Sequence, residues 1–240
     1  MEHSGPISWL LTLPLLPHDP HYIHVNGAIV VFLFITAVSL AAHYILRKNP
    51  EAYLIPAGRP TLVSVTDVVI EGLHNMVTGA LGEGGEKYFP FIASVFLFVF
   101  FCNVLGLLPM SFPPTGNTST TFAIGLAAFC YYNFQGIREQ GLKNYLEHFL
   151  MGLGPAGVVI ALLEMVSHLI RPASLGIRLF VNMHVDHAVV HSFSTLTSWS
   201  IWLVPVPLLL FGIVVCTIQA FVFAMLTAVY VEMATAHEEH

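Results

Sequence analysis

The chain has 240 residues, of which 56% are hydrophobic and 9% are charged, and its mean hydropathy is +0.77. A soluble domain usually carries about 25% charged residues, so this composition excludes an ordinary soluble fold and favours an integral membrane protein. Fourteen acidic residues outnumber the eight Lys and Arg, which argues against nucleic-acid binding. The cysteines Cys102, Cys130 and Cys216 each lie in an apolar run, as small hydrophobic residues do, so a disulfide-stapled secreted fold is excluded as well.

The N-terminal part of the chain predicts an external arm followed by one membrane crossing. Residues 1–25 are rich in Pro and His and contain no Lys or Arg, so they lack the basic start of a cleaved signal peptide and are expected to form an extended arm. Residues 26–46 supply about twenty mostly apolar positions, enough for one helix to cross roughly 30 Å of hydrocarbon. Arg47 and Lys48 follow at once, so the positive-inside rule places this end in the cytoplasm and the N-terminus outside.

The next part predicts one surface helix and two more crossings. Residues 61–80 are less apolar and carry Asp67 and Glu71, which is typical of an amphipathic helix that lies on the cytoplasmic membrane surface. Crossings are predicted at about residues 89–108 and 119–137, joined by a loop that is rich in Pro and has no charge.

Two overlong apolar segments fill the last third of the chain. Residues 157–196 are interrupted only by Pro172 and would form a helix roughly 60 Å long; residues 204–236 would give roughly 50 Å. Helices longer than the hydrocarbon layer must tilt, kink or extend past the membrane surface. The predicted fold is all-α, with five transmembrane helices, the last two steeply tilted, and one surface helix. We expect an external arm at 1–25 and a single membrane domain at 26–240.

The distribution of basic residues agrees with five crossings and a cytoplasmic C-terminus. The outer arm and outer loops have no Lys or Arg, as the positive-inside rule requires. The basic residues of the inner loops are Arg47, Lys48, Arg59, Lys87, Arg138 and Lys143. The other two, Arg171 and Arg178, lie within the fourth apolar segment.

Arg178 has no charged residue within six positions. Arginine is effectively always protonated, and placing it in a membrane costs several kcal/mol or more. A side chain that reaches interfacial water, or an ion pair with Glu164 or Asp186, remains an alternative to a functional charge. At about 100° per residue, the helix is predicted to carry a polar stripe on the Arg178 side. The residues within roughly 80° of Arg178 are Glu164, Arg171, Ser174, Asn182 and Asp186.

Three histidines, His184, His187 and His191, fall near the opposite face of the same helix. Their spacing would permit metal ligation, but no second cluster of comparable density lies on another predicted span. Together with Asp186 and Gln219 they better fit a wetted proton path, because histidine titrates near neutral pH. A hydrogen-bonded structural role for each histidine stays open. A helix that is polar on two faces must contact protein or water on both.

The segment Pro172-Ala-Ser-Leu-Gly-Ile-Arg-Leu-Phe-Val-Asn-Met183 resembles the signature of subunit a of the bacterial F-type ATP synthase. Other stretches agree in the same order along the chain. They are Asn103-Val-Leu-Gly-Leu-Leu-Pro109, Glu164, and Ile218-Gln-Ala-Phe-Val-Phe-Ala-Met-Leu-Thr-Ala-Val-Tyr230. The resemblance covers about residues 60–240.

The resemblance implies a stator subunit beside a rotor ring of small c subunits, each with one membrane-buried carboxylate. Two offset half-channels reach that carboxylate, and proton flow through them drives rotation and ATP synthesis. Arg178 matches the essential arginine, whose charge lowers the pKa of a passing rotor carboxylate and blocks leakage. The resemblance places Asn182 and Gln219 near Arg178. It assigns Glu164 and Ser174 to the cytoplasmic half-channel, and Asp186, His187 and Asn103 to the outer one.

The sequence also departs from the common pattern of that family. Many relatives have Gly-Glu where this chain has Asp186-His187, and a His where it has Gly212. We expect Asp186 and His187 together to replace the usual Glu–His pair, with Gly212 making room. His184 and His191 have no counterpart in the family pattern and are expected to line the outer vestibule.

The implied partners are the rotor ring, the peripheral stalk of b subunits, the other F1Fo subunits and membrane lipid. The translocated ion is expected to be H⁺, with Na⁺ as the alternative, and no cofactor, metal or nucleic acid is expected. The chain has no Walker A motif, so it is predicted to be non-catalytic, with nucleotide chemistry left to partner subunits. The absence of a transit peptide and the charge bias favour a bacterial inner membrane.

Functions of other classes make different predictions. A stand-alone ion channel or secondary transporter, the main alternative, would show inverted repeats, which five crossings do not provide. A membrane enzyme with a histidine-bound metal would lose activity on chelation. A serine protease lacks a candidate nucleophile, because no Gly-x-Ser-x-Gly motif is present.

Overall fold

The computed structural model divides the chain into two compact units, Met1–Pro114 and Thr115–His240. Apart from short turns and caps, the described residues are helical, so the all-α prediction is confirmed for them. The described residues are 19, 22–48, 61–82, 85–108, 113–142, 145, 162–163, 166–168, 170–185 and 205–235.

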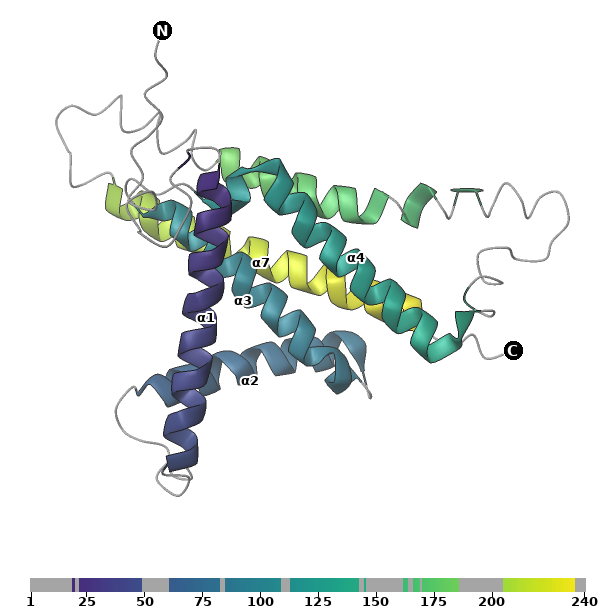
Figure 1. The fold of residues 1–240 in the computed structure, drawn as a ribbon, viewed down its shortest axis with the longest axis horizontal. Coiled ribbons are helices and arrows are strands. Elements are labelled where there is room, and N and C mark those ends of the chain that lie inside the picture. Colours follow the sequence, from purple (N-terminus) through teal and green to yellow (C-terminus); the bar gives the residue numbers. More distant parts are fainter. Residues whose placement is uncertain are drawn as a thin grey trace, which may run out of the picture. The chain divides into compact units, whose positions relative to one another are not determined.

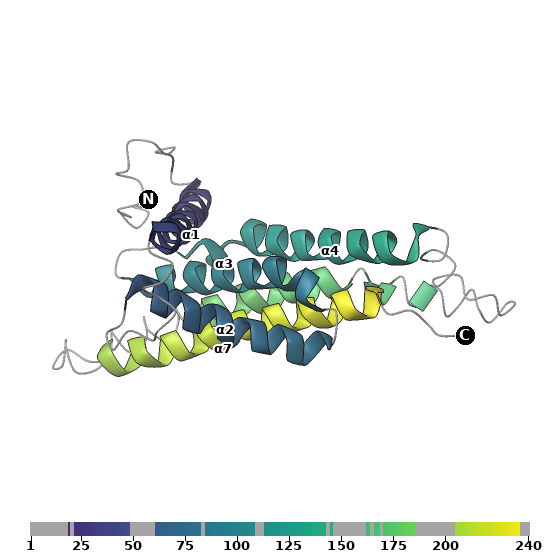
Figure 2. The ribbon, with the colours of Figure 1, turned by 90° about the horizontal axis from the view of Figure 1, so that it is seen from below.

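Among its described residues, the first unit contains three long helices joined in part by a short 3-10 helix. They are α1 (Ile23–Lys48), α2 (Leu62–Leu81), η4 (Gly85–Tyr88) and α3 (Phe89–Leu107). Helix α1 contacts both α2 and α3 (Figure 1), and α2 and α3 lie side by side (Figure 2). Within this unit, α2 and α3 each contact the other two long helices and η4.

Helix α2 begins and ends at clear local signals. The Thr61 side chain caps the first turn by accepting a hydrogen bond from the backbone N–H of Ser64 at 3.3 Å. Gly82 ends the helix with a φ of +64°, a left-handed conformation that favours glycine. The surface helix predicted at 61–80 is thus confirmed as a helix to within one residue at either end.

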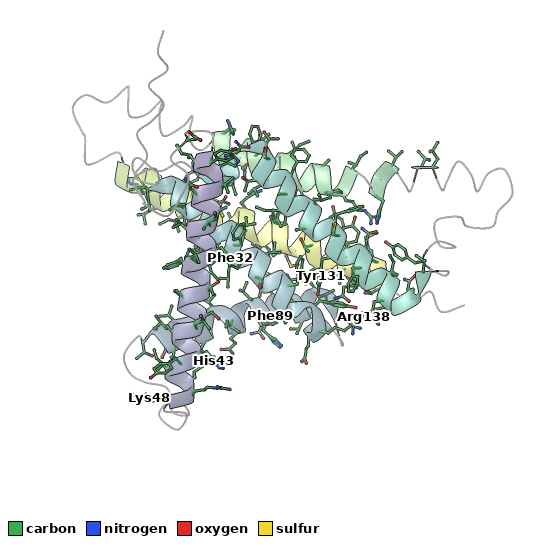
Figure 3. The ribbon with its side chains drawn as sticks, in the orientation of Figure 1. Phe32, His43, Lys48, Phe89, Tyr131 and Arg138 are labelled. Atoms are coloured by element: carbon green, nitrogen blue, oxygen red, sulfur yellow. The ribbon has the colours of Figure 1, made fainter. Side chains whose placement is uncertain are left out.

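Helix α1 is packed on one side only. Gly27 lies so close to α3 and the following loop that an added Cβ would be 2.8 Å from the Pro114 side chain. The small apolar core between α1 and α3 consists of Val31, Cys102 and Leu105. Most other side chains of α1 are exposed, among them Phe32, His43 and Lys48 (Figure 3). A helix with so much exposed apolar surface is suited to lipid.

The second unit is built around α4 (Thr118–Gln140), a helix at residues 170–185, and α7 (Pro205–Thr235). Helices α4 and α7 contact each other and run in the same direction (Figure 1). In the C-terminal halves of the two helices, the rings of Tyr132 and Tyr230 lie 5.8 Å apart. Further on, the Gln140 side chain donates to the backbone oxygen of Ala234 at 3.2 Å.

The helix at 170–185 packs antiparallel to α4 through glycines. A Cβ added to Gly125 would lie 2.7 Å from the backbone oxygen of Pro172, and one added to Gly176 would lie 3.3 Å from the backbone of Phe122. Small residues allow helix backbones in a membrane to approach closely, so glycine sets the distance between these two helices.

Three helices of the described residues are long and apolar enough to cross a membrane: α1, α3 with η4, and α7 from Leu209. They coincide with the crossings predicted at 26–46, 89–108 and 204–236. The crossing predicted at 119–137 corresponds to α4, which is long enough but more polar than the other three. All described residues within the crossing predicted at 157–196 are helical.

Candidate functional site

Arg178 lies on the exposed side of the helix at 170–185. The opposite side is buried within the second unit by Leu175, Leu179 and Met183. Arg178 shares its side with Ile177 and Val181, whose exposed fractions are 51% and 49%. This distribution follows from helical periodicity, because residues three or four positions apart share a face. The chain therefore presents a permanent positive charge on an exposed helix side, between Ile177 and Val181.

Asn182, one turn beyond Arg178, reaches α7. Its Nδ2 donates to Oε1 of Gln219 at 2.7 Å, and Gln219 is buried, with 5% of its surface exposed. The hydrogen bond joins the helix that carries Arg178 to α7 across 37 positions of sequence. In this arrangement the Gln219 oxygen faces Asn182 and its Nε2 points away from Asn182.

The other end of the Gln219 amide is a buried donor. Within the part of the chain that the structure describes, its Nε2 has no hydrogen-bond partner. An unsatisfied buried donor costs about 1–3 kcal/mol and is uncommon in folded proteins, so it marks a place where water or a partner's acceptor fits.

The other residues of the predicted site that the structure describes differ from one another in exposure and in their contacts. Ser174 is exposed and donates to the Arg171 carbonyl oxygen at 2.9 Å. His184 is exposed, with its ring centre 4.1 Å from that of Phe180. Asn103 is buried in α3 of the first unit. The predicted site residues that lie outside the described residues are Glu164, Asp186, His187 and His191.

Neither interpretation of the three histidines is tested by the structure, because two of them lie outside the described residues. Among the residues that are described, no group of three His, Cys, Asp or Glu side chains is arranged to hold a metal ion.

A second polar cluster, not predicted as a site from the sequence, joins α4 to the helix that precedes Arg178. Asn133 of α4 is its centre. The Tyr145 hydroxyl donates to Asn133 Oδ1 at 2.8 Å, and His168 Nε2 lies 2.8 Å from the same oxygen. The amide of Asn133 in a predicted crossing and a histidine three positions before Arg171 were the signals in the sequence that could have indicated it.

Aromatic rings and one cation enclose this cluster. The His168 ring stands edge-on against Phe129 and Tyr132, each with centres 5.2 Å apart. The guanidinium carbon of Arg171 lies 5.3 Å from the centre of the Tyr230 ring, a cation–π contact with α7. Arg171 belongs to the predicted polar stripe, but unlike Ser174 and Arg178 it is half-buried.

Tyr145, in the segment after α4, is buried and keeps its proton. Burial raises the pKa of its phenol above the ordinary value, and the positive charge of Arg171 opposes this only in part. A phenol with a raised pKa stays neutral across the physiological range, so Tyr145 remains a hydrogen-bond donor to Asn133.

Known proteins resemble this chain along most of its length. The family model described as ATP synthase A chain matches residues 27–232. A relative from Bdellovibrio bacteriovorus, named ATP synthase subunit a, is 37% identical and covers 96% of this chain and 98% of its own. Relatives of the same name from Sulfurihydrogenibium sp. and Geobacter sulfurreducens are each 39% identical; they cover 82% and 85% of this chain, and 95% and 82% of their own.

Proposed function

Because the chain belongs to the family of ATP synthase subunit a, and is therefore the stator subunit of the Fo membrane sector, we propose that Arg178 is its essential fixed charge. The observation that carries this role is an arginine exposed between the exposed apolar side chains of Ile177 and Val181. In a bilayer such a charge must face protein or water. The rotor ring of c subunits, with one membrane-buried carboxylate on each, supplies the matching surface.

The charge has two consequences for proton transfer. At about 4 Å and an effective dielectric constant of about 20, it stabilises a carboxylate by about 4 kcal/mol. A rotor carboxylate that passes Arg178 is therefore forced to release its proton, because its ionised form is favoured. The same charge repels free protons, so it prevents them from crossing between the two half-channels without turning the ring.

Asn182 and Gln219 hold this charge in place. Their hydrogen bond at 2.7 Å fixes the turn after Arg178 to α7, and the buried Nε2 of Gln219 supplies a donor to water or to the rotor carboxylate. A polar pair of this kind in a membrane helix is expensive to bury without a function, which supports its place in the proton path.

The half-channels lead away from Arg178 in opposite directions. Glu164 and Ser174 line the cytoplasmic one. The outer one uses Asp186, His187 and Asn103, with Asp186 and His187 in place of the usual Glu–His pair. His184 and His191 line the outer vestibule.

The full arrangement has five transmembrane helices, with the external arm at 1–25, the membrane domain at 26–240, and the C-terminus in the cytoplasm of a bacterial cell. At 31 residues, α7 is about 46 Å long, so it tilts or extends beyond the hydrocarbon layer. The chain binds the rotor ring and the b-subunit stalk, translocates H⁺ and contributes no nucleotide chemistry. The same architecture could carry Na⁺, because the ion is bound by the rotor.

The test is ATP-driven acidification of inverted membrane vesicles that contain the assembled complex. Arg178→Ala should abolish pumping while the amount of assembled complex stays the same. Arg138→Ala, which removes an exposed arginine at the end of α4 (Figure 3), is the matched control and should pump normally. Equal pumping by the two variants would refute the role of Arg178.

A further inference from the structure

The amide of Asn133 can have only one orientation in the polar cluster of the second unit. Its Nδ2 lies 2.7 Å from the backbone oxygen of Phe129. A carbonyl oxygen can only accept, so the nitrogen of the amide must face it. The amide oxygen then faces Tyr145 and His168, and both of these side chains must donate.

This orientation fixes the tautomer of His168. An amide oxygen carries no proton, so Nε2 of His168 must carry the hydrogen of their 2.8 Å contact. When the ring is neutral, Nδ1 is then its basic atom. The hydrogen bond to Asn133 thus fixes which ring nitrogen of His168 exchanges protons.

The ring is also held in a defined electrostatic setting. Arg171, three positions later on the same helix, is the charged residue beside the ring among the described residues. Three tyrosines lie around the cluster. The Tyr132 ring contacts the His168 ring, and the Tyr145 hydroxyl donates to Asn133. The Tyr230 ring of α7 contacts the Arg171 guanidinium. Glu164, four positions before His168, lies outside the described residues.

His168 lies beside the cytoplasmic half-channel that we propose for this chain. It precedes Arg178 by ten residues in the sequence, on the same side as Glu164 and Ser174, which are assigned to that half-channel. Its side chain is half-buried and lies at the end of α4 that leads to the basic inner loop. Ser174 and Arg171 occupy the intervening turns.

We propose that His168 is a proton-carrying group of the cytoplasmic half-channel and that Asn133 is the positioning residue that makes Nδ1 the exchanging atom. In the direction of synthesis, a hydronium ion on the Arg178 side gives its proton to Nδ1 and becomes water, and an N–H bond forms. The same N–H bond breaks as the proton passes to a water molecule on the cytoplasmic side, which becomes hydronium. The ring returns to its starting state. This role rests on the stator function proposed for Arg178.

The first measurement is the pumping rate of assembled complexes in inverted vesicles. His168→Gln keeps a side-chain N–H for Asn133 but cannot titrate, and it should slow pumping about tenfold, less than the 10²–10⁴ typical of general acid–base groups because water can substitute in part. His74→Gln is the matched control, since His74 is also half-buried and edge-on to a phenylalanine, at 5.3 Å from Phe89. If both variants pump equally fast, His168 carries no protons.

Chemical rescue separates proton transfer from packing. His168→Ala should regain pumping when imidazole is added but not with pyrazole, a ring of the same size and much weaker basicity. Equal rescue by the two compounds would mean that the ring only fills space, which overturns the role. Asn133→Leu should shift the dependence of pumping on cytoplasmic pH, whereas an unchanged profile would remove Asn133 from the mechanism. Arg178→Ala is measured in parallel; if that variant pumps, it is the stator function itself that fails.

Discussion

Replacing Gly125 by alanine tests whether the spacing between α4 and the Arg178 helix matters for proton transfer. The added Cβ would lie 2.7 Å from the backbone oxygen of Pro172. Neither the oxygen nor the α4 backbone can rotate away as a flexible side chain would. The two helices must therefore separate for the methyl group to fit.

The size of this separation follows from the contact distance. Ordinary van der Waals contact begins at 3.4 Å, so the helices must move apart by about 0.7 Å. Overpacking of this kind costs about 1–3 kcal/mol, and the better helix propensity of alanine returns about 1 kcal/mol. The protein should therefore remain folded. A displacement of about 1 Å at a reacting group can cost 10²-fold in rate, so a shift of this size should slow pumping about 10- to 30-fold.

The assay is again acidification of inverted vesicles at equal amounts of assembled complex. Gly72→Ala is the matched control, because a Cβ added at Gly72 of α2 meets no atom within 4 Å. That variant should pump as the native chain does and gain a little helix stability. If Gly125→Ala also pumps at the native rate, the close approach of the helices does not hold Arg178 in position, and the reasoning from its geometry is wrong.

Two further substitutions test other contacts. Asn182→Leu leaves the buried Gln219 Oε1 without its 2.7 Å donor, so the purified complex should lose about 1–3 kcal/mol of stability and pump poorly; an unchanged melting temperature would contradict the hydrogen bond. Because burial raises the pKa of Tyr145, the unfolded chain releases this phenolic proton at lower pH than the folded chain, and stability should fall as pH rises above about 10. Tyr145→Phe should lack that part of the alkaline decline, as measured by thermal melting across pH; identical alkaline curves would show that the phenol is solvated.

Local signals in the sequence predict the helices well. Long apolar runs give α1, α3 and α7, and the Thr61 cap and Gly82 delimit α2, because each of these features acts over a few residues. Helix α4 is predicted with nearly correct ends although Asn133 and its phenols lower its apolar character.

Contacts between distant residues are predicted less completely. Only the family resemblance predicts that Asn182 and Gln219 lie close together. Nothing in the local sequence links these two residues, which are 37 positions apart. The cluster of Asn133, Tyr145 and His168 escapes prediction because each polar residue alone has an ordinary structural explanation. The cluster is recognised only in the structure, where the Tyr145 hydroxyl and the His168 ring both contact the side-chain oxygen of Asn133.

The exposed arginine also has a consequence for how the complex is made. Before the rotor ring is present, Arg178 would face lipid across an apolar surface, at a cost of several kcal/mol that the assembled complex does not bear. A newly inserted chain is therefore the least stable form of the subunit, and it gains most from meeting the ring soon after synthesis. The charge that we propose to couple the motor thus also favours co-assembly with the ring and exposes orphaned copies to proteolysis.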